Sequence, residues 1–469
     1  MAATADIGIV GLGVMGRNLA LNMRDRGFAV CGLDRSEAAR ERAAAEDIRV
    51  VDNLPELITR LRRPRRVLLM LPAGNAIDEQ LADLLPWLDE GDAVIEGGNS
   101  HYRDTMRRAP MLERRGFGYL GLGVSGGEEG ARHGPALMAG GSEAAWAAVA
   151  PVLEAIAARV EDEPCAARVG ADGAGHFVKT VHNGIEYAVM QLIAETWSLM
   201  AAAGLAHEEA ADRFAAWAKG PLDSYLVEIT AQILRRRDPE SGGPAIEVIR
   251  DRAEQKGTGA WASVAALELG VPAPTIIEAA QARSLSAMWE LREHLAAAPS
   301  LSNTAATAVC PERLGEALMA ATVAAYAQGF ALIRAAGEAH RWDVDLARVA
   351  RLWRGGCIIR ARLLGPIAEA CMRSPGAPSL LADPVFGALA WERLDALREA
   401  ALAGQASGLP VPALASALAF LDGSRTARSA LSLVQAQRDF FGAHGLERTD
   451  RPGRFHFDWT GTGNGEGAP

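Results

Sequence analysis

The stretch "IGIVGLGVMG", residues 7–16, joins a short apolar run to three glycines near the start of the chain. Gly11, Gly13 and Gly16 have GxGxxG spacing, directly after a strand-like segment and at the start of a helical one. In that setting the first glycine permits a tight turn, the second admits a pyrophosphate close to the backbone, and the third lets helix and strand pack. The helix N-terminus supplies N–H donors and a favourable dipole. We therefore predict a dinucleotide-binding loop that includes Gly11, Gly13, Val14, Met15 and Gly16.

Residues 1–175 alternate short apolar runs with helical stretches. The runs "IGIVG", "FAVCGL", "RVLLML" and "DAVIEGG" are strand-like, and each is followed by Gly, Pro or Asp and then by a helical pattern. This rhythm is typical of βαβ units and a largely parallel sheet. We predict an α/β Rossmann-type N-terminal domain, a dinucleotide-binding domain, over residues 1–175.

The composition changes after residue 176. Long Ala- and Leu-rich stretches have helical spacing, and "HFVKTVHNGIEYAVMQLIAETWSLMAAAG", residues 176–204, is one such helix that ends at Gly204. The last stretch loses this periodicity and is rich in glycine, aromatic and charged residues. We predict a large all-α domain over residues 176–435, followed by a C-terminal tail over residues 436–469.

Bulk properties exclude several classes of protein. A chain of 469 residues should hold more than one domain, since single cores stop growing near about 250–300 residues. The net charge of -10 argues against nonspecific nucleic-acid binding but leaves room for a local basic pocket. The five cysteines show no CxxC pair and no metal-ligand spacing, which is typical of reduced thiols in a cytoplasmic protein without a metal site.

Neither a signal peptide nor a membrane span is expected. The N-terminus lacks a basic region followed by an apolar stretch. The longest apolar run, residues 317–333, is short for a membrane span and contains Gln328 and Gly329, so it favours a buried helix. We expect a cytoplasmic protein that binds neither membrane nor nucleic acid.

The end of the second predicted strand, "GLDRSEAAR", carries two conflicting cofactor signals. Asp34 could accept a hydrogen bond from a ribose 2'-hydroxyl, which favours NAD. Arg35 and Ser36 could instead hold a 2'-phosphate, which favours NADP. Both interpretations stay open from the residues alone.

Two further loops follow strand-like segments, "EGGNS" at residues 96–100 and "GVSGGEEGA" at residues 123–131. Loops at the carboxyl ends of parallel strands are where such sheets bind ligands. Asn99 and Ser125 offer neutral hydrogen bonds, and Gly126 with Gly127 allows close approach of a ligand to the backbone. Taken singly, each loop could equally be an ordinary turn.

The stretch "KTVHNGIEY", residues 179–187, gathers groups that bind or transfer protons. Lys179, His182, Asn183 and Glu186 fall at i, i+3, i+4 and i+7, so one helix face can carry all four, with Tyr187 beside it. The alternative is a Lys–Glu pair on an exposed face. The flanking residues are apolar and leave only this one polar stripe, which favours chemistry.

These stretches, together with "SYLVEIT", "DRAEQKGTGAW", "ARSLS", "WRGGCIIR" and "LVQAQRDFFGAH", resemble the decarboxylating 6-phosphogluconate dehydrogenases from about residue 6 to residue 460. The broader β-hydroxyacid dehydrogenase group shares the glycine loop and the lysine region but generally lacks the long helical domain and this tail. The resemblance implies oxidative decarboxylation of 6-phospho-D-gluconate to D-ribulose 5-phosphate and CO2 in the pentose phosphate pathway, with reduction of NADP or NAD.

The resemblance also implies roles for single residues. Lys179 is similar to the family's general base, which takes the C3 hydroxyl proton and then polarises the 3-keto oxygen as CO2 leaves. Such a lysine must reach its neutral form through burial or cationic neighbours. Glu186 is similar to the acid that protonates the enediol carbon, so a raised pKa is expected. Asn99 is implied near the nicotinamide and the substrate. Further residues implied to orient the substrate are Ser125, Gly126, Gly127, His182 and Asn183.

The substrate's phosphate needs charge-assisted donors. The resemblance assigns this role to Tyr187, Lys256, Arg283, Arg438 and His444. In this family the tail of one subunit enters the other, so Arg438 and His444 would serve the neighbouring subunit, in a homodimer with composite sites. The family uses no metal, because the lysine does the polarising.

The chain departs from the family pattern at four places. The family commonly has Asn where this chain has Asp34, and a carboxylate there should repel a 2'-phosphate, which leaves NAD or dual use open. GTGKW reads "GTGAW", EYGDMQ reads "EYAVMQ", and "ARSALSL" lacks a proline. A dehydrogenase for another β-hydroxy acid would not need the phosphate-binding cations. A regulatory protein with a degraded site would have lost Lys179 or Glu186. We therefore expect an active enzyme.

Overall fold

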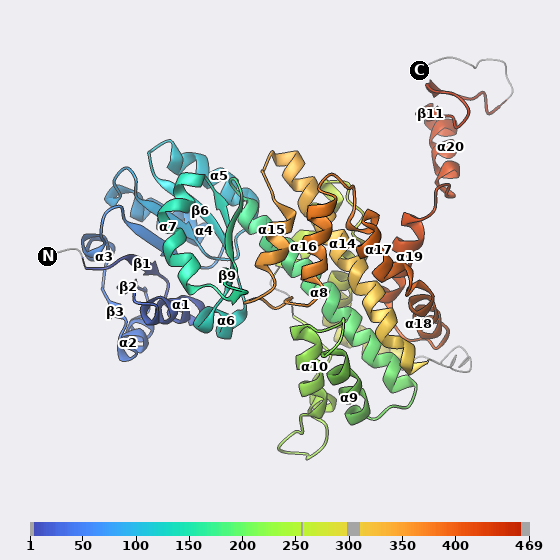
Figure 1. Cartoon of the computed structure of the whole chain (residues 1–469), viewed down its shortest axis with the longest axis horizontal. Helices are drawn as coiled ribbons and strands as arrows, with labels where there is room; N and C mark the ends of the chain where they lie inside the picture. The colour runs from blue at the N-terminus through green and yellow to red at the C-terminus, as the bar shows by residue number, and fades with distance from the viewer. Residues whose placement is uncertain (1–3, 255–256, 298–309, 461–469) are drawn as a thin grey trace. The chain divides into compact units, whose positions relative to one another are not determined.

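The computed structural model describes residues 4–254, 257–297 and 310–460 (Figure 1). The chain divides into two compact units, Met1–Leu418 and Ala419–Pro469.

The first unit begins with an eight-stranded sheet in the order β10-β7-β6-β5-β4-β1-β2-β3. Its neighbouring strands pair in parallel, except for β6 and β7, which are antiparallel. The strands are β1 Ile7–Val10, β2 Val30–Leu33, β3 Arg49–Val50, β4 Arg66–Leu69, β5 Ala93–Glu96, β6 Gly118–Ser125, β7 Ala136–Gly141 and β10 Ala166–Gly170. The four strand-like runs named above coincide with β1, β2, β4 and β5, so the predicted Rossmann-type domain is confirmed.

Helices cover both faces of this sheet because successive strand residues point to opposite sides. In β4, Leu68 packs into one apolar core, and Val67 and Leu69 pack into another. The helices of this part are α1 Val14–Asp25, α2 Glu37–Ala45, α3 Leu54–Arg60, α4 Asn75–Leu84, α5 Tyr102–Glu113, α6 Gly127–His133 and α7 Glu143–Ile156. A small hairpin, β8 Arg159–Val160 with β9 Glu163–Pro164, precedes β10.

The rest of the first unit is helical, as predicted. Its longest members are α8 Ala174–Ala202 and α14 Leu314–His340, which pack side by side (Figure 1). The others are α9 His207–Trp217, α10 Tyr225–Arg235, α11 Thr258–Glu268, α12 Pro274–Ala287, α13 Trp289–Ala296, α15 Leu346–Leu352, α16 Leu364–Arg373, α17 Pro384–Trp391 and α18 Leu394–Ala406. The boundary between the two units falls within α19 Pro412–Ser424. One described helix, Pro311–His340, is long and apolar enough to cross a membrane, but 89% of its most apolar window is buried inside the protein.

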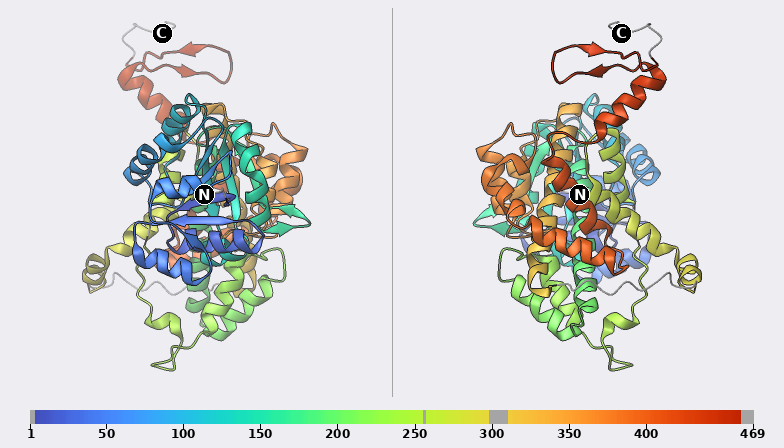
Figure 2. Two further views of the ribbon diagram at one scale, coloured as in Figure 1. Left: turned by 90° about the vertical axis from the view of Figure 1, so that its left-hand side faces the viewer. Right: turned by 90° about the vertical axis from the view of Figure 1, so that its right-hand side faces the viewer.

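The second unit contains α20 Leu431–Gly442 and the antiparallel pair β11 Leu446–Glu447 and β12 Arg454–Phe455 (Figure 2). The predicted domain limits at residues 175/176 and 435/436 stay predictions. The first lies within the first turn of α8, and the second lies within α20.

Candidate active site

The glycine loop has the geometry that a dinucleotide requires. Gly11 has φ +98°, and a Cβ atom there would collide with the carbonyl oxygen of Met70. A Cβ atom at Gly16 would collide with the carbonyl oxygen of Gly11, so this glycine lets α1 pack against the strand end. Around Gly13, by contrast, a Cβ atom would meet nothing within 4 Å. The open side of the loop is therefore at Gly13, where the pyrophosphate is expected.

Asp34 closes the end of β2 and is tied to the glycine loop. Its Oδ2 accepts a hydrogen bond from the Leu12 N–H at 2.6 Å, and its Oδ1 accepts one from the Ser36 N–H at 2.8 Å. The Ser36 hydroxyl accepts the Ala39 N–H at 3.3 Å and so caps α2. Two of the three residues considered for the ribose therefore also fix the local backbone.

A cleft at the glycine loop carries charges of both signs. It is lined by Gly11, Gly13, Asp34, Arg35, Arg40 and Asp52, among others. The Arg40 guanidinium donates to the Asp34 carbonyl at 2.7 Å and lies 3.4 Å from an Asp52 carboxylate oxygen. Arg35 is exposed. Three carboxylates, of Asp34, Asp52 and Asp83, and two guanidinium groups thus line the cleft where a ribose is expected.

The loop that carries Asn99 is anchored by a buried ion pair. Glu96, the last residue of β5, is fully buried and accepts hydrogen bonds from Arg108 at 2.8 Å and from the Tyr119 hydroxyl. Arg108 also binds Asp78 at 2.8 Å. Asn99 itself is exposed at the tip of the loop. Sequence reasoning missed this anchor, although a glutamate at the end of an apolar strand was a usable signal.

Helix α8 lies directly on β6 because both elements have glycines at the contact. A Cβ atom at Gly123 would lie 2.6 Å from Lys179 Cβ, and one at Gly175 would collide with the carbonyl oxygen of Gly121. Any side chain at these positions would push the helix away from the sheet. The contact places Lys179 close to the strand end that carries Ser125.

The predicted polar face of α8 is present and almost wholly buried. His182 lies at its centre: Nε2 is 3.0 Å from Ser125 Oγ, and Nδ1 is 3.4 Å from Lys179 Nζ and 3.1 Å from Asn183 Oδ1. The same Nδ1 atom is 3.7 Å from a Glu186 carboxylate oxygen. The structure therefore brings together Ser125, Lys179, His182, Asn183 and Glu186.

Burial shifts the ionisation of these groups in the directions that acid–base chemistry needs. It lowers the pKa of Lys179, although the nearby Glu186 opposes the shift. It raises the pKa of Glu186, against the opposite effects of Lys179 and Arg283. Burial and the Lys179 charge hold the pKa of His182 well below its usual value, so this imidazole is neutral. A neutral amine and a protonated carboxyl group are thus both accessible.

A second wall of the site comes from the "WRGGCIIR" segment, which sequence reasoning used only for the resemblance. The Trp353 ring meets His182 edge to face, with 5.6 Å between ring centroids. Gly126 and Gly127 have φ +110° and +63°, and a Cβ atom at Gly126 would lie 2.5 Å from the carbonyl oxygen of Gly356. Burial raises the pKa of the adjacent Cys357 to about 12, so its thiol stays protonated.

Two of the residues predicted to bind the phosphate, Tyr187 and Arg283, are in contact in the first unit. The Arg283 guanidinium stacks on the Tyr187 ring, 3.4 Å from the centroid. It also donates to the Glu254 carbonyl at 3.2 Å and to Met190 Sδ at 3.3 Å. Lys256 lies outside the described residues. The other two predicted phosphate ligands, Arg438 and His444, belong to the second unit.

Two comparisons of the sequence with family models cover most of the chain. Residues 6–170 match the NAD binding domain of 6-phosphogluconate dehydrogenase, and residues 175–459 match the 6-phosphogluconate dehydrogenase C-terminal domain. The chain belongs to the 6-phosphogluconate dehydrogenase family. The predicted family, its oxidoreductase class and the dinucleotide-binding character of the N-terminal part are confirmed.

Members of the 6-phosphogluconate dehydrogenase family match over almost their whole length. The NADP(+)-dependent, decarboxylating 6-phosphogluconate dehydrogenase of Bacillus subtilis is 46% identical over 464 residues, which cover 97% of this chain and 98% of that protein. The decarboxylating enzyme of Drosophila melanogaster is 45% identical and covers 99% and 98%. The solved 6-phosphogluconate dehydrogenase of Plasmodium falciparum, studied in complex with NADP+ and with 6-phosphogluconate, has a TM-score of 0.92 and 37% identity, covering 97% of this chain and 100% of that chain.

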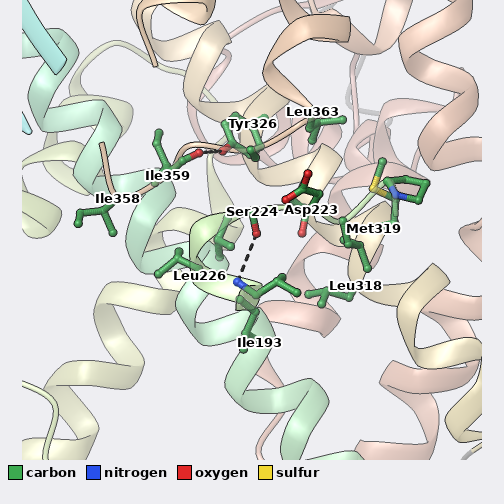
Figure 3. Close-up of a pocket in the computed structure, with 16 residues that line it drawn as sticks. Ile193, Asp223, Ser224, Leu226, Leu318, Met319, Tyr326, Ile358, Ile359 and Leu363 are labelled. Carbon is green, nitrogen blue, oxygen red and sulfur yellow. Dashed lines mark hydrogen bonds between the residues drawn. The ribbon is translucent and has the colours of Figure 1, made fainter. Parts of the chain in front are cut away.

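Another cavity in this 6-phosphogluconate dehydrogenase family member lies between α8, α10 and α14 (Figure 3). Its lining is mostly apolar and includes Ile193, Leu226, Met319 and Ile359. The described residues that line it contain no lysine or arginine, so it does not suit a phosphorylated sugar acid. Within the described ranges, no group of three or more His, Cys, Asp or Glu residues could hold a metal ion.

Proposed function

We propose that this protein oxidises and decarboxylates 6-phospho-D-gluconate to D-ribulose 5-phosphate and CO2 with reduction of NADP. The observation that carries the proposal is the buried stripe on α8, in which Lys179 and Glu186 flank His182 at 3.4 Å and 3.7 Å. Two buried groups that can give and take protons on one helix face support a base and an acid there. The relatives named above support the substrate.

The first step is oxidation at C3. Neutral Lys179 takes the proton of the C3 hydroxyl, while His182, Asn183 and Ser125 hold the substrate's oxygens. The glycine loop would hold the pyrophosphate at Gly13, and the bound nicotinamide accepts the hydride from C3. A lysine desolvated by its surroundings is suited to this role because its charged form is penalised.

The second step is loss of CO2 from the 3-keto acid. Protonated Lys179 donates to the 3-keto oxygen, so the electron pair of the breaking C–C bond is taken up as an enediol. Glu186 then delivers its proton to the enediol carbon that becomes C1 of the pentose phosphate. The enol O–H returns its proton to Lys179. The cycle closes when that proton passes to Glu186, and the Nδ1 atom of His182 lies between the two groups. The raised pKa of Glu186 keeps this carboxyl group protonated until the enediol carbon takes its proton.

The phosphate is proposed to bind Tyr187, Lys256 and Arg283 of one subunit with Arg438 and His444 of the other. A homodimer is supported by the exposed apolar side chains of α20, a surface that a stable partner would cover. These side chains are Leu431, Leu433, Val434, Phe440 and Phe441. A phosphorylated substrate explains the cations, which gluconate or 3-hydroxyisobutyrate would leave without a counter-charge.

NAD use is the second candidate, because Asp34 stands where a 2'-phosphate would be repelled. Arg35 and Arg40 act in the opposite direction. We therefore propose NADP as the cofactor with measurable use of NAD. The product, a pentose phosphate, supports a place in the pentose phosphate pathway, and the family supports a cytoplasmic location.

The proposal is tested with the purified protein, 6-phosphogluconate and each nucleotide in turn. One CO2 should be released for each reduced nucleotide formed, and gluconate should be a far poorer substrate. No turnover with either nucleotide would reject the assignment. Oxidation without CO2 release would instead favour a non-decarboxylating β-hydroxyacid dehydrogenase.

A further inference from the structure

One buried carboxylate organises the second unit. Asp439 is the buried residue of α20, and its side chain is fully enclosed. Its Oδ1 accepts from the Gly445 N–H at 2.9 Å and from His456 Nδ1 at 3.0 Å. Its Oδ2 accepts from the Phe457 N–H at 3.1 Å and from Trp459 Nε1 at 2.8 Å. Four donors therefore fill the acceptor capacity of both oxygens.

These donors come from both ends of the β11–β12 hairpin. Gly445 precedes β11, whereas the other three donors follow β12, so Asp439 ties the end of α20 to the segments on both sides of the hairpin. The neighbouring rings of Phe440 and Phe441 are 60% and 72% exposed. Hydrogen bonds to Asp439, rather than burial of these rings, therefore fix this part of the unit.

The backbone on both sides of His444 is held to the same framework. The Gly445 N–H binds Asp439, the Gly445 carbonyl accepts from Gln435 Nε2 at 2.6 Å, and the His444 carbonyl accepts from Arg454. Gly445 has φ +73°, a conformation that glycine adopts without strain. The turn that carries His444 is thus fastened to α20.

Asp439 is also the immediate neighbour of Arg438. The Arg438 guanidinium is exposed and donates to Gln435 Oε1 at 3.3 Å. A bare carboxylate beside it would repel a phosphate, but this one is enclosed by donors. Burial would raise the pKa of Asp439, yet the hydrogen bonds from His456, Phe457 and Trp459 hold it below its usual range. The carboxylate therefore keeps its charge and its four hydrogen bonds.

We propose that Asp439 is a positioning residue for phosphate recognition, which fixes the turn so that Arg438 and His444 are already spaced for a phosphate before they meet one. This rests on the proposed function, in which those two residues bind the substrate's phosphate. Ordering both ligands in advance removes an entropic cost from binding.

The test uses Asp439→Asn in the full-length chain. An amide at this position presents an NH2 group to one pair of donors, so two hydrogen bonds are lost. We expect KM for 6-phosphogluconate to rise about tenfold or more, and the inhibition constant of inorganic phosphate to rise in parallel. Both kcat and KM for NADP should stay within about threefold. Hydrogen exchange in peptides that cover residues 443–460 should become faster.

Asp450→Asn is the matched control, because Asp450 is exposed and binds only Arg448, at 2.6 and 2.7 Å, among the described residues. Asp450→Asn should leave unchanged both KM for 6-phosphogluconate and the rate of hydrogen exchange in residues 443–460. Trp459→Phe removes a single donor and should shift both quantities in the same direction by a smaller factor, which keeps the test decisive if Asp439→Asn does not fold.

Two results would overturn the inference: wild-type exchange in Asp439→Asn, or faster exchange with wild-type KM for 6-phosphogluconate. Arg438→Ala separates this inference from the proposed function. An unchanged KM in Arg438→Ala rejects the phosphate role of the tail itself. A raised KM in Arg438→Ala together with a wild-type KM in Asp439→Asn rejects only the role given to Asp439.

Discussion

The two helices that carry the proposed substrate contacts differ in what surrounds them. On α8, Lys179 and His182 are buried by the sheet and by neighbouring helices of the same chain. On α20, Asp439 is buried, whereas Phe440 and Phe441 are exposed. The first helix therefore has its polar groups desolvated by its own chain. The second has its polar groups ordered but its apolar groups uncovered.

This difference matches the different roles proposed for the two helices, proton transfer on α8 and phosphate binding on α20. Proton transfer needs shifted pKa values, and these require a low-dielectric surrounding that only a packed core provides. Phosphate binding needs exposed cations held at a fixed spacing, which hydrogen bonds at a surface can provide. The predictions below test whether the two helices really depend on these different supports.

Loss of the amine on α8 should have the largest effect. Lys179→Met keeps much of the side-chain volume but removes the base, so kcat should fall by about 10³-fold or more, with KM for 6-phosphogluconate changed only a few-fold. Lys219→Met, at an exposed lysine, is the control and should behave as the wild type. Steady-state kinetics give both values. Turnover near wild type in Lys179→Met would remove Lys179 from the mechanism.

Disturbing the support of α8 should have the next largest effect. Gly123→Ala would place a Cβ atom 2.6 Å from Lys179 Cβ, so helix or strand must shift. We expect a loss of about 1–3 kcal/mol in unfolding free energy and a fall in kcat of about tenfold or more. Gly365→Ala in α16 is the control, because a Cβ atom there would meet nothing within 4 Å. Equal melting temperatures and rates for the two variants would contradict the packing argument.

Substitutions in the cofactor cleft test how charge sets the preference for NADP over NAD, independently of both helices. Asp34→Asn removes the charge that opposes a 2'-phosphate, so the ratio of kcat/KM for NADP to that for NAD should rise about tenfold, equivalent to roughly 1.4 kcal/mol. Arg35→Gln should lower the same ratio. Asp52→Asn, which removes another carboxylate from this cleft, is the control and should change the ratio less. An unaltered ratio in Asp34→Asn would show that Asp34 serves only to hold Leu12 and Ser36.

The pH dependence of kcat/KM tests the proton roles of Lys179 and Glu186. In our mechanism kcat/KM rises with pH as Lys179 loses its proton and falls as Glu186 loses its own. Because burial lowers the first pKa and raises the second, the two limbs approach each other. Glu186→Gln cannot ionise, so its profile should lose the alkaline fall. An alkaline limb that persists in this slower variant would point to another group.

Local spacing explains what the sequence could predict. The glycine loop, the four strands and the stripe from Lys179 to Glu186 depend on residues less than ten positions apart, and all appear in the structure. The supports of the site could not be predicted in this way. Arg108 anchors Glu96 from α5, and Trp353 meets His182 from a distant segment. Such contacts depend on how separate elements pack, which no short pattern encodes.

The C-terminal tail also contains a contact that the sequence could not predict. Arg438 and His444 were identified by resemblance, but the role of Asp439 between them is visible only once His456 and Trp459 fold back onto it. A carboxylate in a stretch without periodicity reads as a solvated surface charge. The structure shows that it is enclosed.

A mixed dimer tests most directly whether the site combines α8 of one subunit with the tail of the other. Lys179→Met and Arg438→Ala chains would be co-expressed with different affinity tags, and the mixed dimer isolated through both. Each parental dimer should show little activity at low 6-phosphogluconate. In the mixed dimer one of the two sites combines an intact Lys179 with an intact Arg438, so we predict about half of the wild-type kcat/KM. A mixed dimer no more active than its parents would contradict the composite site.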